Sequence, residues 1–291
     1  MSNTSSAGAF AAGDSLIATL RHAGLCCNSL SEAGLLDEET TTGAVLGALA
    51  GSYPLIAEER GSQPMRWHRF TKKPAQYGDS EAANGADFAL AILGENGETR
   101  LALFQAKKSA IRETSTGWKV NLRHVVKSAT GDEEAQMITL ERLGLALIML
   151  AKNPAKLSEP GGAPPEPRLS WVHYLLYGPG TPVCIPLSDM DGCLEAERLL
   201  IGSVNYFEFK PESQPSFMEV LAEVSAPAPM SWLTIATPAL FGGLPAYLQV
   251  LPVLVGGTEK AWKHVPINRA PSRRKRANWK TRPSAISPKA W

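Results

Sequence analysis

The chain is organised around two pieces of sequence, Glu81-Ala-Ala-Asn-Gly-Ala-Asp-Phe88 and Leu103-Phe-Gln-Ala-Lys107. They lie in two apolar runs, Asp87–Leu93 and Arg100–Lys107, which the short polar segment 94–98 separates. That segment contains Asn-Gly, a strong signal for a tight turn between two strands. We therefore predict that the two runs pair as an antiparallel β-hairpin.

The length of the hairpin loop decides which side chains share a face, because neighbouring side chains on a strand point to opposite faces. A two-residue loop would place Asp87 opposite Ala106. A three-residue loop, with Gly97 in a left-handed bulge, places Asp87 opposite Gln105 instead, with Lys107 on the same face. We predict the three-residue loop, which gathers a carboxylate, an amide and a lysine at one end of the hairpin.

This combination of side chains suits metal-dependent chemistry on phosphate. Carboxylate and carbonyl oxygens are natural ligands of Mg²⁺, which often bridges to a substrate phosphate. A nearby lysine can orient an attacking water or neutralise charge that develops on the phosphate. Gly85-Ala-Asp87 followed by Gln105-Ala-Lys107 resembles the PD-(D/E)xK nuclease superfamily in its Gln-x-Lys variant. It is most similar to small nucleases from bacterial anti-phage and mobile-element loci.

The resemblance covers roughly residues 35–178 and has definite implications. It implies an α/β, restriction-endonuclease-like fold, in which a mixed sheet is flanked by helices. The implied activity is endonuclease hydrolysis of phosphodiester bonds, on DNA, with Mg²⁺ or Mn²⁺ as cofactor and a role in anti-phage defence. Asp87 would bind the metal, Gln105 would replace the usual second carboxylate, and Lys107 would position the water.

A further acidic ligand is expected, and three glutamates compete for the role. Glu38 and Glu39 follow Asp37, which is a good N-cap for a helix, and related nucleases often take a ligand from this helix. Glu38 falls near the centre of the helix's apolar stripe, whereas Glu39 falls to its side. Glu81, six residues before Asp87, is the third candidate. Its position on the apolar face of the helix alone favours Glu38. Gln136, where related nucleases commonly place a polar residue facing the site, is a further polar candidate.

Basic residues suggest a nucleic-acid surface. The segment after the hairpin combines cationic residues with an aromatic one, a combination that favours nucleic acid over a small anion. A second basic stretch, residues 66–73, also suits a phosphate backbone. The net charge of +1 conceals a body of about −8 and a tail (259–291) of about +9. The candidate contacts are Lys108, Arg112, Trp118, Lys119 and Arg123, with Arg273, Arg274, Lys275 and Arg276 in the tail.

Composition predicts an ordinary globular protein, with 44% hydrophobic and 20% charged residues. We expect a disordered N-terminus (1–13), one nuclease-like domain (14–258) with a Pro-rich insertion (153–168), and the disordered basic tail. The four cysteines lack any metal-ligand spacing. No apolar run is long enough to span a membrane, and no signal peptide is recognisable. A cytoplasmic, non-membrane protein is expected.

The remaining pattern predicts further helices and strands. Gly51 is expected to end the helix that starts at Asp37, with a strand near Ile56. A core helix starts near Gly131, and a buried strand follows at 170–177, in which His173 is expected to be a core residue. Other expected helices cover 14–25, 195–201 and 217–223, and another strand covers 206–210.

Two functional alternatives remain open. The chain could be a degenerate nuclease fold that binds nucleic acid or assembles a complex, and the neutral Gln105 favours this view. It could also be an effector that a protein partner or a small signal activates. Oligomeric state, DNA-versus-RNA choice and cut-site preference leave no pattern in the sequence.

Overall fold

A computed structural model describes most of the chain between residues 14 and 245. The described ranges are 14–33, 37–60, 65–70, 72, 80–93, 99–108, 111–127, 133–152, 169–178, 181–199, 204–235, 240–241 and 244–245. The predicted N-terminal segment, hairpin loop, Pro-rich insertion and basic tail all lie outside these ranges.

A six-stranded mixed sheet forms the centre of the molecule. Five strands run in the order β1-β2-β3-β8-β9, and β11 also pairs with β3. Among the described strands of this sheet, β3 and β8 pair in parallel and the other pairs are antiparallel. The strands are β1 (Met65–Arg69), β2 (Phe88–Leu93), β3 (Thr99–Lys107), β8 (Val172–Leu176), β9 (Val183–Pro186) and β11 (Leu233–Ile235).

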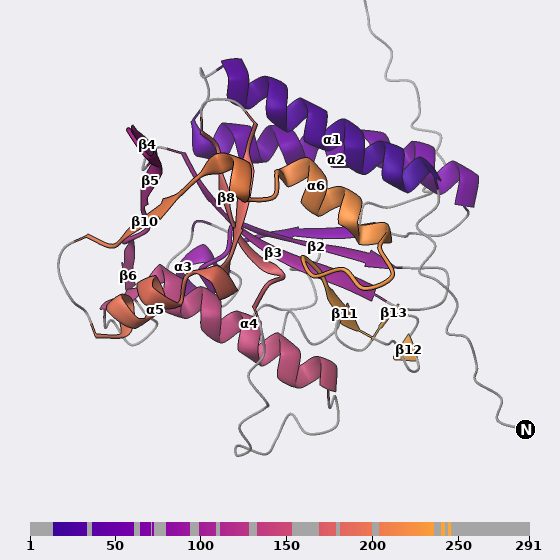
Figure 1. Cartoon of the computed structure of the whole chain (residues 1–291). Helices are drawn as coiled ribbons and strands as arrows, with labels where there is room; N and C mark the ends of the chain where they lie inside the picture. Colours follow the sequence, from indigo (N-terminus) through magenta and orange to yellow (C-terminus); the bar gives the residue numbers. More distant parts are fainter. Residues whose placement is uncertain are drawn as a thin grey trace, which may run out of the picture.

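Helices cover both faces of this sheet (Figure 1). Helices α1 (Asp14–Ala33) and α2 (Glu38–Arg60) share one hydrophobic core with α6 (Phe217–Ala222), while α4 (Gln136–Lys152) and α5 (Asp191–Arg198) belong to the core on the opposite face. Strands β2 and β3 are therefore buried on both sides, which explains their near-continuous apolar runs. The α/β class with a mixed sheet flanked by helices is confirmed.

Smaller elements complete the description. The short helix α3 (Glu81–Asn84) precedes β2. A three-stranded sheet has the order β10-β5-β4, and β6 and β7 pair with each other, as do β12 and β13. These strands are β4 (Ile111–Thr114), β5 (Gly117–Asn121), β6 (Val125–Lys127), β7 (Glu133–Ala135), β10 (Tyr206–Phe209), β12 (Leu240–Phe241) and β13 (Leu244–Pro245). Within the described ranges, 3₁₀ turns lie at 187–189, 211–213 and 223–225.

The predicted hairpin register is confirmed. Phe88 lies opposite Phe104 and Leu93 opposite Thr99, which is the pairing that a three-residue loop requires. The Asp87 backbone N–H donates to the Phe104 carbonyl at 2.9 Å, so Asp87 continues this register opposite Gln105. A shift of one residue would have moved Asp87 to the other face, so this agreement brings the predicted site residues together.

Several predicted boundaries are wrong. Helix α2 begins after the predicted N-cap, with the Thr40 N–H donating to Asp37 Oδ1 at 2.7 Å, but it continues through Gly51 to Arg60. The segment around Ile56 is therefore helical rather than a strand. A single glycine lowers helix propensity without ending a helix, and packing against α1 favours continuation.

Other differences are shifts of a few residues or new strands. Helix α1 runs on to Ala33, and α5 starts earlier than predicted. The helix expected from Gly131 begins only at Gln136, because the acidic residues before it form β7. The predictions of a buried strand at β8 and of elements at β10 and α6 are confirmed.

Candidate functional site

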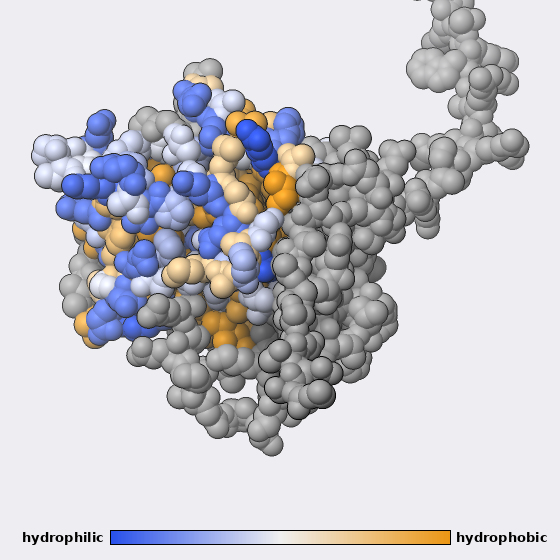
Figure 2. All heavy atoms as spheres, turned by 45° about the vertical axis from the view of Figure 1, so that its right-hand side comes forward, coloured by the Kyte–Doolittle hydropathy of each residue, from blue (hydrophilic) through white to orange (hydrophobic). Residues whose placement is uncertain are grey.

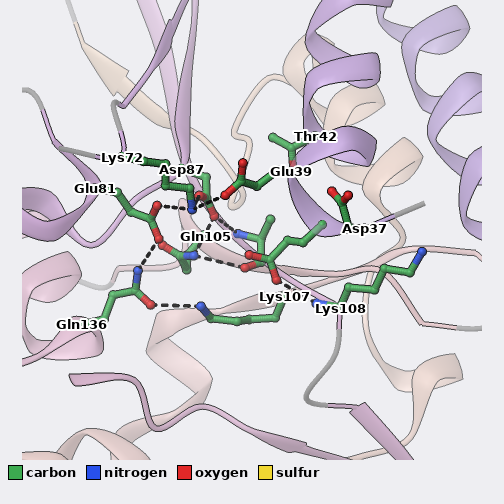
Figure 3. Close-up of polar contacts among 12 residues, drawn as sticks. Asp37, Glu39, Thr42, Lys72, Glu81, Asp87, Gln105, Lys107, Lys108 and Gln136 are labelled. Carbon is green, nitrogen blue, oxygen red and sulfur yellow. Dashed lines mark hydrogen bonds and ion pairs between the residues drawn. The ribbon is translucent and has the colours of Figure 1, made fainter. Parts of the chain in front are cut away.

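The site lies where the hairpin of β2 and β3 ends beside the start of α4 (Figure 3). Asp87 immediately precedes β2, and Gln105 and Lys107 lie at the C-terminal end of β3. All three side chains are on the sheet face covered by α4, because Leu101 and Leu103 on the same alternation belong to that core. The structure therefore brings these three predicted residues together.

Asp87 is bound mainly by the neighbouring strand. Its Oδ2 accepts hydrogen bonds from Gln105 Nε2 at 2.6 Å and from the Ala106 backbone N–H at 2.7 Å. Its other oxygen, Oδ1, lies 3.4 Å from Lys72 Nζ. Gln105 is fully buried, and its Oε1 has no hydrogen-bond partner among the described residues. That oxygen is the type of atom that a bound cation would satisfy.

A polar chain joins Asp87 to Lys107 through α3 and α4. Glu81 Oε2 forms a close ion pair with Lys72 Nζ, while Glu81 Oε1 accepts from Gln136 Nε2 at 2.8 Å. Gln136 Oε1 in turn accepts from Lys107 Nζ at 3.0 Å. Gln136 is fully buried in the first turn of α4 and faces the site. Its amide fixes the positions of both the Lys107 ammonium and the Glu81 carboxylate.

The two glutamates of α2 are placed differently from each other. Glu38 is half-buried, and its Oε2 accepts from the Lys108 backbone N–H at 3.0 Å, just beyond the end of β3. Glu39 is exposed and lies 3.8 Å from Lys72 Nζ. Of the three competing glutamates, Glu81 makes the closer ion pair with the Lys72 ammonium that also contacts Asp87, and its charge is the one that acts on the pKa of Asp87.

Burial and neighbouring charges shift the pKa values of Asp87 and Glu81 in opposite directions. Burial, reinforced by the charge of Glu81, raises the pKa of Asp87 to about 7, although Lys72 opposes this shift. Burial also acts to raise the pKa of Glu81, but its hydrogen bond to Lys72 and that cation's charge leave the pKa below its ordinary value. Glu81 therefore keeps its charge, and Asp87 is the acid that becomes neutral first.

The donor atoms suit a hard divalent cation, but their present contacts suit an ammonium. Among the described residues, no three His, Cys, Asp or Glu side chains are placed to hold a metal ion together. The cation between Asp87 and Glu81 is Lys72 (Figure 3). Two carboxylates and the unpartnered Gln105 Oε1 are oxygen donors of the chemical type that Mg²⁺ prefers, with the Lys72 ammonium in contact with both carboxylates.

Those predicted nucleic-acid contacts that the structure describes do not form one free basic surface. Lys119 pairs with Glu208 at 2.8 Å, and Arg123 lies 3.3 Å from the buried Glu197. The Trp118 ring packs against Phe209 and beside Gly178, so it is partly buried against the core to which α4 and α5 contribute. Arg112 is exposed on β4 opposite Lys119, and Lys108 lies beside the site. The four tail residues are outside the described ranges.

Sequence reasoning missed the role of Lys72. It grouped this residue with basic residues for a phosphate backbone, whereas the structure places its ammonium on Glu81 and Asp87. No spacing rule connects Lys72 to these acids, because it lies between β1 and α3 outside any periodic element. The expectation for His173 is met: it is fully buried and contacts the Ser231 carbonyl at 3.1 Å.

Gly85 lies between α3 and β2 and packs closely against the start of α4, so its substitution tests this packing. Its φ is +72°, and an added Cβ would lie 2.5 Å from the Gln136 carbonyl oxygen and 2.6 Å from the Leu140 nitrogen. Gly85→Ala is expected to lower the free energy of unfolding by about 2–3 kcal/mol in urea denaturation, because it combines left-handed strain with a backbone clash. Gly47→Ala, in α2 with nothing within 4 Å, is the control and should be neutral or stabilising. Equal stability of the two variants would contradict the close packing.

Comparison with known proteins adds no family to this description: no family model, curated protein or solved structure matches the chain. Within the described ranges, no helix is long and apolar enough to cross a membrane. Hydrophilic residues cover much of the described surface in the view of Figure 2, with smaller hydrophobic areas between them.

Proposed function

We propose that the protein is a divalent-metal-dependent nuclease that hydrolyses phosphodiester bonds, with DNA as its substrate and defence against phage as its setting. The observation that carries the proposal is the meeting of Asp87, Gln105 and Lys107 at one end of the hairpin, joined there by Glu81 and Gln136. Acids, an amide and a lysine on rigid elements are the parts that such hydrolysis needs.

The site residues would have distinct roles in this reaction. Asp87, Glu81 and the Gln105 side-chain oxygen would hold the cation, which supplies Lewis acidity toward the phosphate when bound. Lys107, fixed by Gln136, would hold the attacking water and stabilise the extra negative charge on the phosphate. Water would form the new P–O bond, one ester P–O bond would break, and the products would be a phosphate monoester and a hydroxyl.

A second candidate function has one specific observation in its favour. Lys72 already contacts both Glu81 and Asp87, so a protein that has lost its metal could remain folded with this internal cation in place. Such a protein would be a nucleic-acid-binding or complex-assembling module with a nuclease-like site. The neutral Gln105, which leaves less negative charge to attract a metal, points in the same direction.

Cleavage of supercoiled plasmid with Mg²⁺ or Mn²⁺ distinguishes the two functions. We expect nicking or linearisation by the full chain, dependent on metal and lost in Asp87→Ala. A chain shortened to residue 258 tests the tail's contribution to binding separately from chemistry. Salt-dependent DNA binding without cleavage under any metal would instead favour the binding module.

A further inference from the structure

The two buried carboxylates of the site each offer a single oxygen to a cation. Asp87 Oδ2 is occupied by Gln105 and the Ala106 N–H, so only Oδ1 remains. Glu81 Oε1 is occupied by Gln136, so only Oε2 remains. Lys72 Nζ contacts both of these remaining oxygens. Any metal that used the two carboxylates without breaking the amide contacts would need the atoms that Lys72 already holds.

When both carboxylates are ionised, the charges at this place favour a bound cation. Asp87 and Glu81 are each only 8% exposed, and two buried like charges close together are unfavourable unless a positive group compensates them. Glu39, 3.8 Å from Lys72 Nζ, adds a third negative charge at the rim. One ammonium supplies a single positive charge to this group, whereas Mg²⁺ or Mn²⁺ would supply two.

The Lys72 ammonium can move away from the two carboxylates without a change in the core. Its side chain is 44% exposed, and it lies between elements rather than within a helix or strand. A lysine stem is flexible, so the ammonium can swing into solvent while the backbone stays in place. The carboxylates cannot move away as easily, because protein amides hold both of them.

We propose that Lys72 and a divalent cation are alternative occupants of Asp87 Oδ1 and Glu81 Oε2, so that Lys72 acts as a built-in competitor and sets the metal affinity of the site. This inference rests on the proposed metal-dependent function. In the metal-free protein Lys72 holds the carboxylates in their bound geometry. When the metal binds, the displaced ammonium is released at the rim of the site, where it can meet an anionic phosphate.

Direct binding of Mn²⁺ tests this competition without any activity measurement. Isothermal titration of the full chain is compared for wild type, Lys72→Met and Lys72→Arg, at a pH where Asp87 is ionised. Lys72→Met is expected to bind Mn²⁺ about tenfold more tightly than wild type, because the competing cation is gone. Lys72→Arg keeps a cation at this position and should remain close to wild type.

Arg198→Met provides a matched control. Arg198, the last residue of α5, also bridges two carboxylates, those of Glu141 on α4 and Glu195 on α5. It contacts none of the proposed metal ligands in these ion pairs. Its replacement should leave Mn²⁺ affinity unchanged. Urea denaturation verifies that each variant is folded before titration.

The outcomes separate this inference from the proposed function. Mn²⁺ binding by wild type with equal or weaker binding by Lys72→Met would overturn the competition and leave the nuclease proposal standing. Absence of Mn²⁺ binding in both folded proteins would overturn the competition and the metal-dependent function together. Tighter binding by Lys72→Met but not by Arg198→Met is the result that supports it.

Discussion

Lys107→Ala is expected to abolish plasmid cleavage while leaving DNA binding and folding intact. The Lys107 ammonium is held by Gln136 Oε1 at 3.0 Å, beside the oxygens that would hold the metal. In the proposed reaction it holds the water and meets charge that is present only in the transition state, so its loss should act on kcat rather than on binding. Removing one such group costs about 10²–10³ in rate.

The measurement is a single-turnover plasmid assay, run beside a gel-shift titration of the same DNA. Arg142→Ala, which removes the ion pair between Arg142 of α4 and Glu134 of β7, is the control and should cleave like wild type. Gln136→Ala should fall between the two, because it frees Lys107 without removing it. Cleavage by Lys107→Ala at the wild-type rate, or a parallel loss of DNA binding, would contradict the role given to this residue.

The sequence predicts the part of the site that depends on strand alternation. Once the hairpin loop is taken as three residues, alternation alone puts Asp87, Gln105 and Lys107 on one face, and the pairing of Phe88 with Phe104 bears this out. The buried strand β8 could also be predicted from a local pattern, because a short apolar run flanked by glycine and proline is typical of a buried strand.

The contacts made by long side chains could not be predicted in this way. Lys119 was expected to face nucleic acid, but its partner Glu208 lies 89 residues further along the chain. Arg123 is likewise bound by Glu197 of α5, which no local pattern places nearby. Lys72 is the same case within the site. Charge composition shows that a lysine is present, while only the fold decides which acid it meets.

The helix boundaries illustrate a different limit. Gly51 looks like a helix end from its local propensity, and Pro54 three residues later strengthens that interpretation. Helix α2 nevertheless continues to Arg60, and its first half packs against α1 in a shared core. Tertiary packing of this kind can outweigh a local cost in propensity. Propensity therefore located the start at Asp37, where a side-chain cap defines it, better than the end.

The second prediction concerns how Asp87 couples stability to pH in the metal-free protein. Its pKa is about 7 in the folded state, above its ordinary value of 3.8, mainly because of burial. Between these two values the unfolded chain has released a proton that the folded chain retains, so stability falls as pH rises. The stabilising contribution is fully present below pH about 4 and is lost as pH rises through about 7.

Asp87→Asn should remove this dependence, because asparagine stays neutral in both states and can still accept from Gln105 and Ala106. Glu81 and other acids titrate in both proteins, so the informative quantity is the difference in unfolding free energy between variant and wild type. We expect this difference to be near zero at pH about 4 and to favour the variant by about 4 kcal/mol above pH about 7. Urea denaturation with a chelator present measures it, and Glu212→Gln, an exposed acid after β10, should follow wild type throughout. Parallel pH profiles for wild type and Asp87→Asn would mean that Asp87 is ionised in the folded protein over the whole range, with Lys72 fully compensating its burial.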